Sequence, residues 1–123
     1  MFYECFELTS IPQLDTSSAT DMGDMFNGCN HLTSIPELNA SSVNNFSSMF
    51  NSCTSLKSIG MYGFTRSINI SFTALGHDAL VAFLNQAGTA YNSSQKIRMG
   101  SDKPALLSDE EKAIATNKGW TLA

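Results

Sequence analysis

Residues 25–38 read Met-Phe-Asn-Gly-Cys-Asn-His-Leu-Thr-Ser-Ile-Pro-Glu-Leu, and much of this wording occurs three times in the chain. A Met-Phe pair precedes each of three cysteines, which lie 24 residues apart at Cys5, Cys29 and Cys53. The motif Leu-Thr-Ser-Ile-Pro recurs at the same spacing and weakens to Leu-Lys-Ser-Ile-Gly at 56–60. A fixed period of this size indicates a solenoid, in which each repeat buries its apolar face against its neighbours.

Each unit predicts one short helix and one strand. Four apolar residues per unit follow the spacing that places side chains on one face of a helix: Met22, Met25, Phe26 and Cys29, then Phe46, Met49, Phe50 and Cys53. The stretch from Leu8 to Leu14 predicts the strand, and Pro12 marks its end because proline lacks a ladder donor. We expect an α/β leucine-rich-repeat-like solenoid, right-handed, with a short parallel sheet on one side and short helices on the other.

The second half of the chain keeps the alternation of strands and helices, but its sequence repeats less regularly. The predicted elements are a strand at 67–72, a helix at 78–86 with Gly76 as N-cap and Gly88 at its end, a strand at 96–99, a helix opened by the capping box Ser108–Glu111 and reaching about residue 117, and a strand at 120–122. We therefore divide the chain into 24-residue repeats over 1–63, the first one truncated, and irregular units over 64–123 that cap the same solenoid.

The composition excludes several classes of protein. Of the 123 residues, 42% are hydrophobic and 15% are charged, which is typical of a folded domain rather than a disordered one. The net charge of −4 argues against nucleic-acid binding, because no basic stripe could displace counterions. No apolar run is long enough for membrane insertion.

Met1-Phe2 matches the Met-Phe pair of the later units, so the chain begins in the middle of a repeat. Two interpretations stay open. A fragment of a longer array would place the protein on the cell surface, among secreted proteins or on a virion. If Met1 is the true start, the half-repeat is a cap and the protein is expected in the cytoplasm, since Met1–Glu4 does not open a signal peptide.

The string Met-Phe-x-x-Cys-x-x-Leu-Thr-Ser-Ile-Pro-x-Leu over residues 1–63 resembles the BspA-like leucine-rich repeat, a family of bacterial and mycoplasma surface proteins that also occurs in phage proteins. The segment 113–121 resembles the closing segment that often follows such repeats. The resemblance implies a role in adhesion and protein binding. It brings no shared catalytic motif.

The chain offers no pattern typical of a catalytic or metal site. Cysteines on equivalent faces of stacked units are separated by the spacing between units, which is too wide for a disulfide or for one tetrahedral zinc. We expect them to be small core residues. His31 lies close to Cys29, but the apolar face is expected to bury Cys29, which disfavours a nucleophile and base pair. The acidic run 109–111 suits a helix N-terminus. We expect no cofactor, no metal and no enzymatic activity.

The candidate binding surface consists of columns that vary between units whose other positions stay fixed. The candidate residues are Gln13, Glu37 and Met61 in one column, and Asp15 and Asn39 in the next column, whose third member is Gly63. We expect these side chains to face solvent on the sheet side. The favoured function is recognition of a protein or glycan, as part of a bacterial surface or phage structural protein. Two alternatives stay open: a small intracellular protein-binding inhibitor, which a phage could encode, and a structural spacer.

Overall fold

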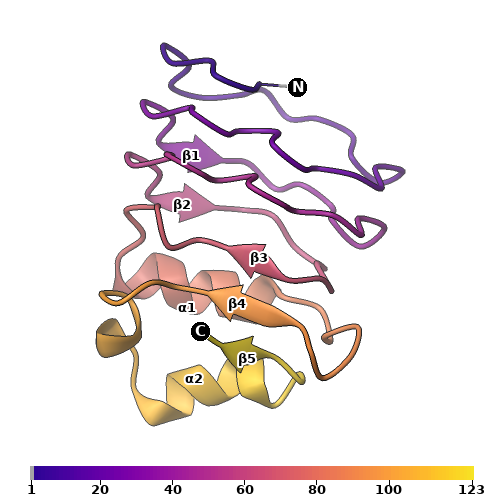
Figure 1. Ribbon diagram of the computed structural model, residues 1–123, viewed down its shortest axis with the longest axis vertical. Coiled ribbons are helices and arrows are strands. Elements are labelled where there is room, and N and C mark those ends of the chain that lie inside the picture. Colours follow the sequence, from indigo (N-terminus) through magenta and orange to yellow (C-terminus); the bar gives the residue numbers. More distant parts are fainter. Residues whose placement is uncertain (1) are drawn as a thin grey trace.

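The computed structural model describes residues 2–123, which wind into successive coils stacked along one axis (Figure 1). Residue 2 lies near one end of the stack and the C-terminal helices lie at the other. The elements in chain order are β1 (Ser34–Ile35), β2 (Ser58–Ile59), β3 (Ile68–Asn69), α1 (His77–Gln86), β4 (Lys96–Arg98), the 3-10 helix η1 (Pro104–Leu106), α2 (Asp109–Thr116) and β5 (Thr121–Leu122).

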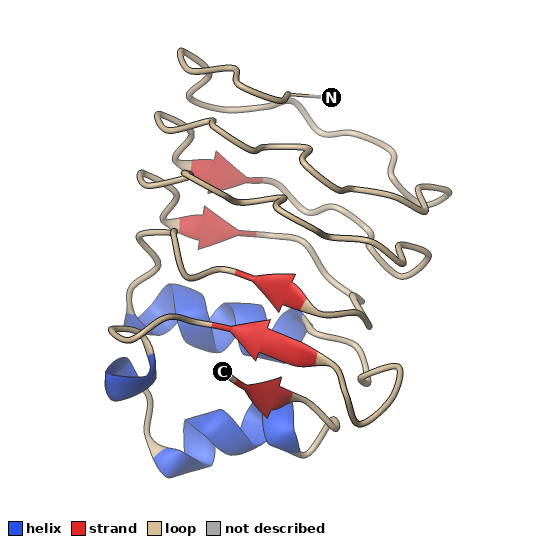
Figure 2. Cartoon of the chain, viewed as in Figure 1, coloured by secondary structure: helices blue, strands red, loops and turns tan. Residues whose placement is uncertain are grey.

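Parallel pairing joins consecutive coils on two opposite sides of the stack (Figure 2). β1 pairs with β2 so that Ile35 faces Ile59, which keeps the 24-residue register. On the near side of Figure 2, β3, β4 and β5 form a second parallel sheet, with Ile97 of β4 between Ile68 and Leu122. These facing residues have buried or half-buried side chains, so pairing of the strands also stacks the core.

The short helices predicted within residues 22–29 and 46–53 are wrong. Both segments form successive turns. The N–H groups of Met22 and Phe26 donate to carbonyls of the next coil, at 2.9 and 3.1 Å, rather than to their own segment. Asp24 and Ser48 also adopt left-handed backbone, with φ of 59° and 57°, which a helix excludes. A chain of turns places apolar side chains inward at nearly the spacing of a helix, and this explains why the pattern misled.

The strand predicted at Leu8–Leu14 is also absent, and only Thr9 carries a backbone bond from that stretch to the next coil, Thr33 N–H to Thr9 O at 3.1 Å. The helices and strands predicted for the second half are present, but the strand predicted at 67–72 is limited to Ile68–Asn69 and ends in a turn at residues 71–72. In α2, the Ser108 hydroxyl accepts from the Glu111 N–H at 3.1 Å, and the Glu111 carboxylate accepts from the Ser108 N–H at 2.9 Å. Gly76 is the N-cap of α1, but its C-cap is Ala87 rather than a glycine.

One continuous apolar core runs through the stack. The ring of Phe26 is stacked between Phe2 and Phe50, with centroid distances of 5.5 and 6.2 Å. Cys29 and Cys53 are fully buried, which confirms the prediction that they are core residues. Toward the C-terminal end, the buried Trp120 indole packs against the Phe64 ring, with 5.7 Å between the centroids, and its N–H donates to Gly88 O at 2.9 Å.

Candidate functional site

Gln13 and Glu37 lie side by side on consecutive coils and are both exposed. The Gln13 amide donates a hydrogen bond to the backbone carbonyl of Glu37, so the glutamine bridges the two coils along the column. The Glu37 carboxylate has no hydrogen-bond partner among the described residues, which leaves it available to a ligand. The structure therefore brings these two candidates together.

Asp15 and Asn39 occupy equivalent turns, where their side chains stabilise the backbone. Asp15 Oδ1 accepts from the hydroxyl and the N–H of Ser17, at 2.7 and 3.1 Å. Asn39 Oδ1 accepts in the same way from Ser41, at 2.7 and 2.9 Å. The hydroxyl of Ser17, followed by its N–H, lowers the pKa of Asp15. Asp15 is exposed and Asn39 is half-buried, so the second coil offers less of this column to solvent than the first coil does.

Met61 does not belong to this surface, because its side chain is fully buried. The register explains the error. Tyr62, not Gly63, forms the bridge with Asn39, so the third unit is one residue shorter than the second between its isoleucine and this bridge. Met61 consequently takes the inward place of Leu38, and Tyr62, which is 43% exposed, takes the place next to Asn39.

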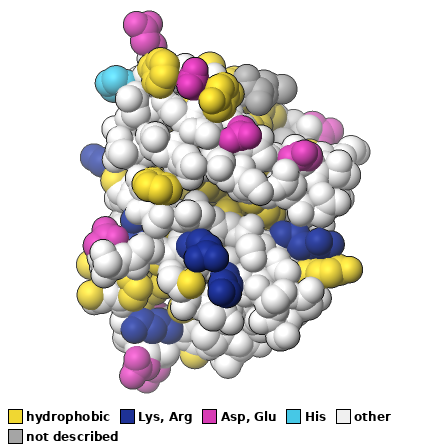
Figure 3. Space-filling model, in the orientation of Figure 1, with side chains coloured by type: hydrophobic (Ala, Val, Ile, Leu, Met, Phe, Trp, Pro, Cys, Tyr) yellow, Lys and Arg dark blue, Asp and Glu magenta, His cyan; other side chains and the backbone are white. Residues whose placement is uncertain are grey.

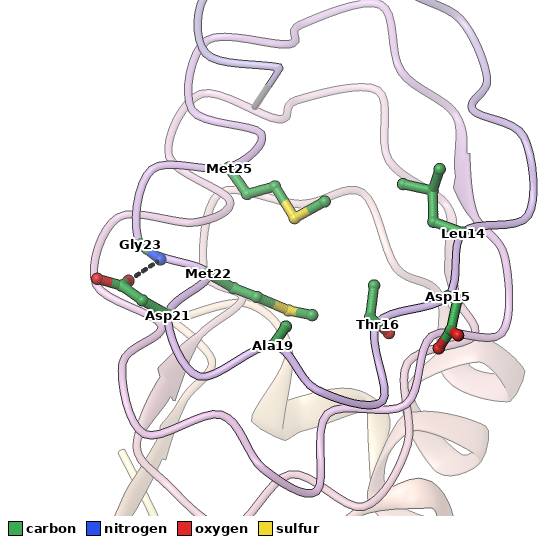
Figure 4. Close-up of a pocket in the computed structure, with 8 residues that line it drawn as sticks. All are labelled: Leu14, Asp15, Thr16, Ala19, Asp21, Met22, Gly23 and Met25. Atoms are coloured by element: carbon green, nitrogen blue, oxygen red, sulfur yellow. Dashed lines mark hydrogen bonds between the residues drawn. The ribbon is translucent and has the colours of Figure 1, made fainter.

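A cavity of about 310 Å³ opens beside these candidates. Figure 4 shows the Met22 and Met25 side chains reaching into it from one wall toward Leu14 and Thr16 on the other. The remaining lining residues are Asp15, Ala19, Asp21 and Gly23. Asp15 thus belongs to both the predicted column and the cavity. Sequence reasoning missed this cavity, because its existence depends on how the coils pack on one another.

The polar groups at the cavity already stabilise the backbone. Asp21 Oδ1 accepts from the Gly23 N–H at 2.8 Å and from the Asn45 side chain at 2.9 Å. The Thr16 hydroxyl, on a residue only 8% exposed, donates to Asn39 O at 2.8 Å. A cavity with an apolar wall and a carboxylate beside it could accommodate a ligand that carries an apolar group next to a hydrogen-bond donor.

The residues that could supply a nucleophile or metal ligands are not assembled. Burial raises the pKa of the Cys29 thiol and raises that of Cys53 to about 12. His31 Nδ1 lies 2.6 Å from Phe6 O on the surface. Within residues 2–123, no group of three or more His, Cys, Asp and Glu side chains is placed to hold a metal ion.

The sequence matches the family described as "Mycoplasma protein of unknown function, DUF285" over residues 1–101, and the chain belongs to this family. The match covers the 24-residue units and continues through β3, α1 and β4. Neither the curated proteins nor the solved structures yielded a match. None of the helices in the described part of the chain has the length and hydropathy needed to cross a membrane.

Proposed function

We propose that this chain is a non-enzymatic recognition module, a BspA-like leucine-rich-repeat solenoid that binds a protein or a glycan. The stacked coils with a 24-residue register support the solenoid part of the proposal. The resemblance of residues 1–63 to BspA-like repeats supports adhesion as the role, within a bacterial surface protein or a phage structural protein. Cell-surface or virion placement is part of the same proposal.

One observation carries the recognition role. Gln13 and Glu37 are different, exposed side chains at equivalent positions of two coils whose inward neighbours Ile11 and Ile35 are the same and buried. A scaffold that fixes its interior while its surface column varies can change the ligand without changing the fold.

The proposed surface contains the exposed or half-buried column residues and the tyrosine that the register brings beside them: Gln13, Asp15, Glu37, Asn39 and Tyr62. Tyrosine provides a large contact area and a hydroxyl at little entropic cost, as is common at recognition sites. The two carboxylates in this set favour ligands that offer hydrogen-bond donors or positive charge.

The test is a double variant, Gln13→Arg with Glu37→Arg, measured on a glycan array and on a panel of immobilised extracellular-matrix proteins. Both positions are exposed, so the variant should fold, and affinity for any ligand bound by the unmodified chain should fall at least about tenfold, or 1.4 kcal/mol. The matched control is Asn117→Arg with Glu110→Arg, which changes the charge equally at exposed positions near α2. Equal binding by both variants would place recognition elsewhere.

A further inference from the structure

On the near side of the stack, the hydrogen bonding between coils is interrupted between the segment 46–52 and β3. The N–H groups at positions 22, 24, 26 and 28 donate to the carbonyls at 45, 47, 49 and 51, over 2.9 to 3.1 Å. Among the described residues, no backbone bond continues from the segment 46–52 to β3, where the chain passes next. Bonding resumes below β3, where the N–H of Ile70 donates to Arg98 O at 2.8 Å.

The peptide geometry makes segment 46–52 present backbone N–H donors on the side that faces β3. A trans peptide points its C=O and N–H in opposite directions, and residues 2–123 contain no cis peptide bond. The carbonyls at 45, 47, 49 and 51 accept from the coil that contains residues 22–28. The N–H groups at 46, 48, 50 and 52 therefore point away from residues 22–28 and toward β3. The carbonyls of Phe46, Ser48 and Phe50 are used inside the turns, at 3.1 to 3.3 Å. Those four N–H groups have no partner in the described chain.

A cleft of about 200 Å³ lies at this interruption. It is lined by Phe46, Ser47 and Ser48 from the coil above, and by residues 67–69 and Arg98 from below. None of these lining residues is acidic. Arg98 is exposed, and its guanidinium has no hydrogen-bond or ion-pair partner within residues 2–123. Both walls therefore present unpaired donors.

The surface around the cleft is basic although the whole chain has a net charge of −4. Figure 3 shows Lys and Arg side chains near the middle of this face, at the height of β3 and β4, whereas most of the acidic side chains in view lie toward the upper end. Arg66, which precedes Ser67 of the cleft, lies over the Tyr91 ring at 3.6 Å from its centroid. Local charge thus favours an anion at a position where the backbone offers donors.

We propose that this cleft binds a tetrahedral oxyanion, as carried by a sulfate or phosphate ester. The Ser47 N–H donates to Asn45 Oδ1 at 3.0 Å, so the free donors are the alternate N–H groups on either side of it. Backbone N–H groups that point into one concavity make it electropositive and suited to such anions. The Phe46 and Ser48 N–H groups approach from the upper wall, and the Arg98 guanidinium can supply a two-pronged contact from the lower wall. Donors from two walls suit an anion with oxygens in several directions better than a flat carboxylate. The site is separate from the Gln13 and Glu37 surface.

The test is titration of ¹⁵N-labelled protein with sodium sulfate and with sodium phosphate, at constant ionic strength held by sodium chloride. Saturable shifts of the Phe46 and Ser48 amide signals are expected with at least one anion. Arg98→Gln should weaken binding at least tenfold, and Arg98→Lys, which keeps the charge without the fork, should fall between. Lys57→Gln is the matched control, because Lys57 is exposed beside β2 on the opposite side.

Two further probes identify the source of the anion. Tighter binding of a sulfated disaccharide than of glycerol 3-phosphate assigns the cleft to sulfate esters of glycans, and the reverse order assigns it to phosphate esters. The proposal would be overturned if sodium chloride alone produced the same amide shifts as sulfate or phosphate, or if the shifts did not saturate. An unchanged affinity in a folded Arg98→Gln variant would also overturn it. These outcomes do not depend on the recognition surface, since none of the changes touches it.

Discussion

The thiol of Cys53 donates a hydrogen bond to the carbonyl oxygen of Phe26 in the preceding unit, with the sulfur 3.1 Å from the oxygen. Cys29 makes the same contact with Phe2 at 2.9 Å. The Phe26 carbonyl also accepts from the Cys29 N–H at 3.0 Å, so the thiol gives it a second donor as well as filling space. The 24-residue spacing of the cysteines is thus a consequence of the way consecutive coils bond to each other.

This burial predicts unequal thiol reactivity. Cys5 is half-buried, whereas Cys29 and Cys53 are fully buried, and burial raises the pKa of Cys53 to about 12. Since the thiolate is the reactive species, Cys5 should be alkylated by iodoacetamide first at pH 8. Mass spectrometry of the native protein should show one rapid modification per chain, and all three after unfolding. Rapid modification of Cys53 in the folded state would contradict the buried ladder.

The stacked phenylalanines should be major determinants of stability. Phe26 is fully buried, and Phe26→Ala should reduce the free energy of unfolding by about 3–5 kcal/mol because it leaves a cavity between two rings. Phe72 is 48% exposed, so Phe72→Ala should change it by only about 0.5 kcal/mol. Urea denaturation measures both. A loss below about 1 kcal/mol for Phe26→Ala would mean that the stack does not form.

Two glycines provide a matched pair for the close approach of coils. A Cβ at Gly60 would lie 2.8 Å from both the carbonyl carbon of Pro36 and the nitrogen of Glu37, and these backbone atoms cannot move aside easily. Gly60→Ala should therefore destabilise the fold by about 1–3 kcal/mol.

The control is Gly76→Ala at the N-cap of α1, where a Cβ would meet nothing within 4 Å. Its cost should stay below about 1 kcal/mol, the difference between glycine and alanine as N-caps. Thermal melting of the two variants in the same buffer compares them directly. Equal melting temperatures would show that β1 and β2 are further apart than the structure has them.

The contact between α1 and α2 should make stability depend on pH. His77 Nδ1 lies 2.9 Å from Asp78, and its Nε2 lies 2.7 Å from the Glu111 carboxylate. The bonds to Asp78 and then Glu111 raise the pKa of His77 above 6.5. The Ser108 N–H, followed by the His77 contact, lowers the pKa of Glu111 below 4.5.

The signs of the two shifts define a window. The His77 contribution is fully present below 6.5 and is lost as pH rises through the raised pKa of the folded state. The Glu111 contribution is present above 4.5 and is lost as pH falls through its lowered pKa. The melting temperature of His77→Gln should therefore differ most from that of the unmodified chain between these two values. A difference that stays constant up to pH 9 would contradict a charged contact.

The elements predicted correctly are those that local sequence encodes. The capping box at Ser108 and Glu111 lies within four residues, so its hydrogen bonds form wherever that helix starts. Cys29, Phe26 and their counterparts were identified as core because a repeat must place equal side chains in equal positions. Gln13 and Glu37 were identified as an exposed column on the same argument, and they lie in contact.

What only the tertiary structure decided is how each backbone group is paired. The apolar spacing around Phe26 and Phe50 fits both a helix and a chain of turns, and bonding to the next coil selected the turns. The missing residue after Ile59 moved Met61 inward and Tyr62 outward, which local pattern alone did not show. The cleft at Arg98 exists because bonding between two coils stops there. A repeat in the sequence specifies which side chains are buried together, whereas hydrogen bonds between coils depend on neighbours far away in the chain.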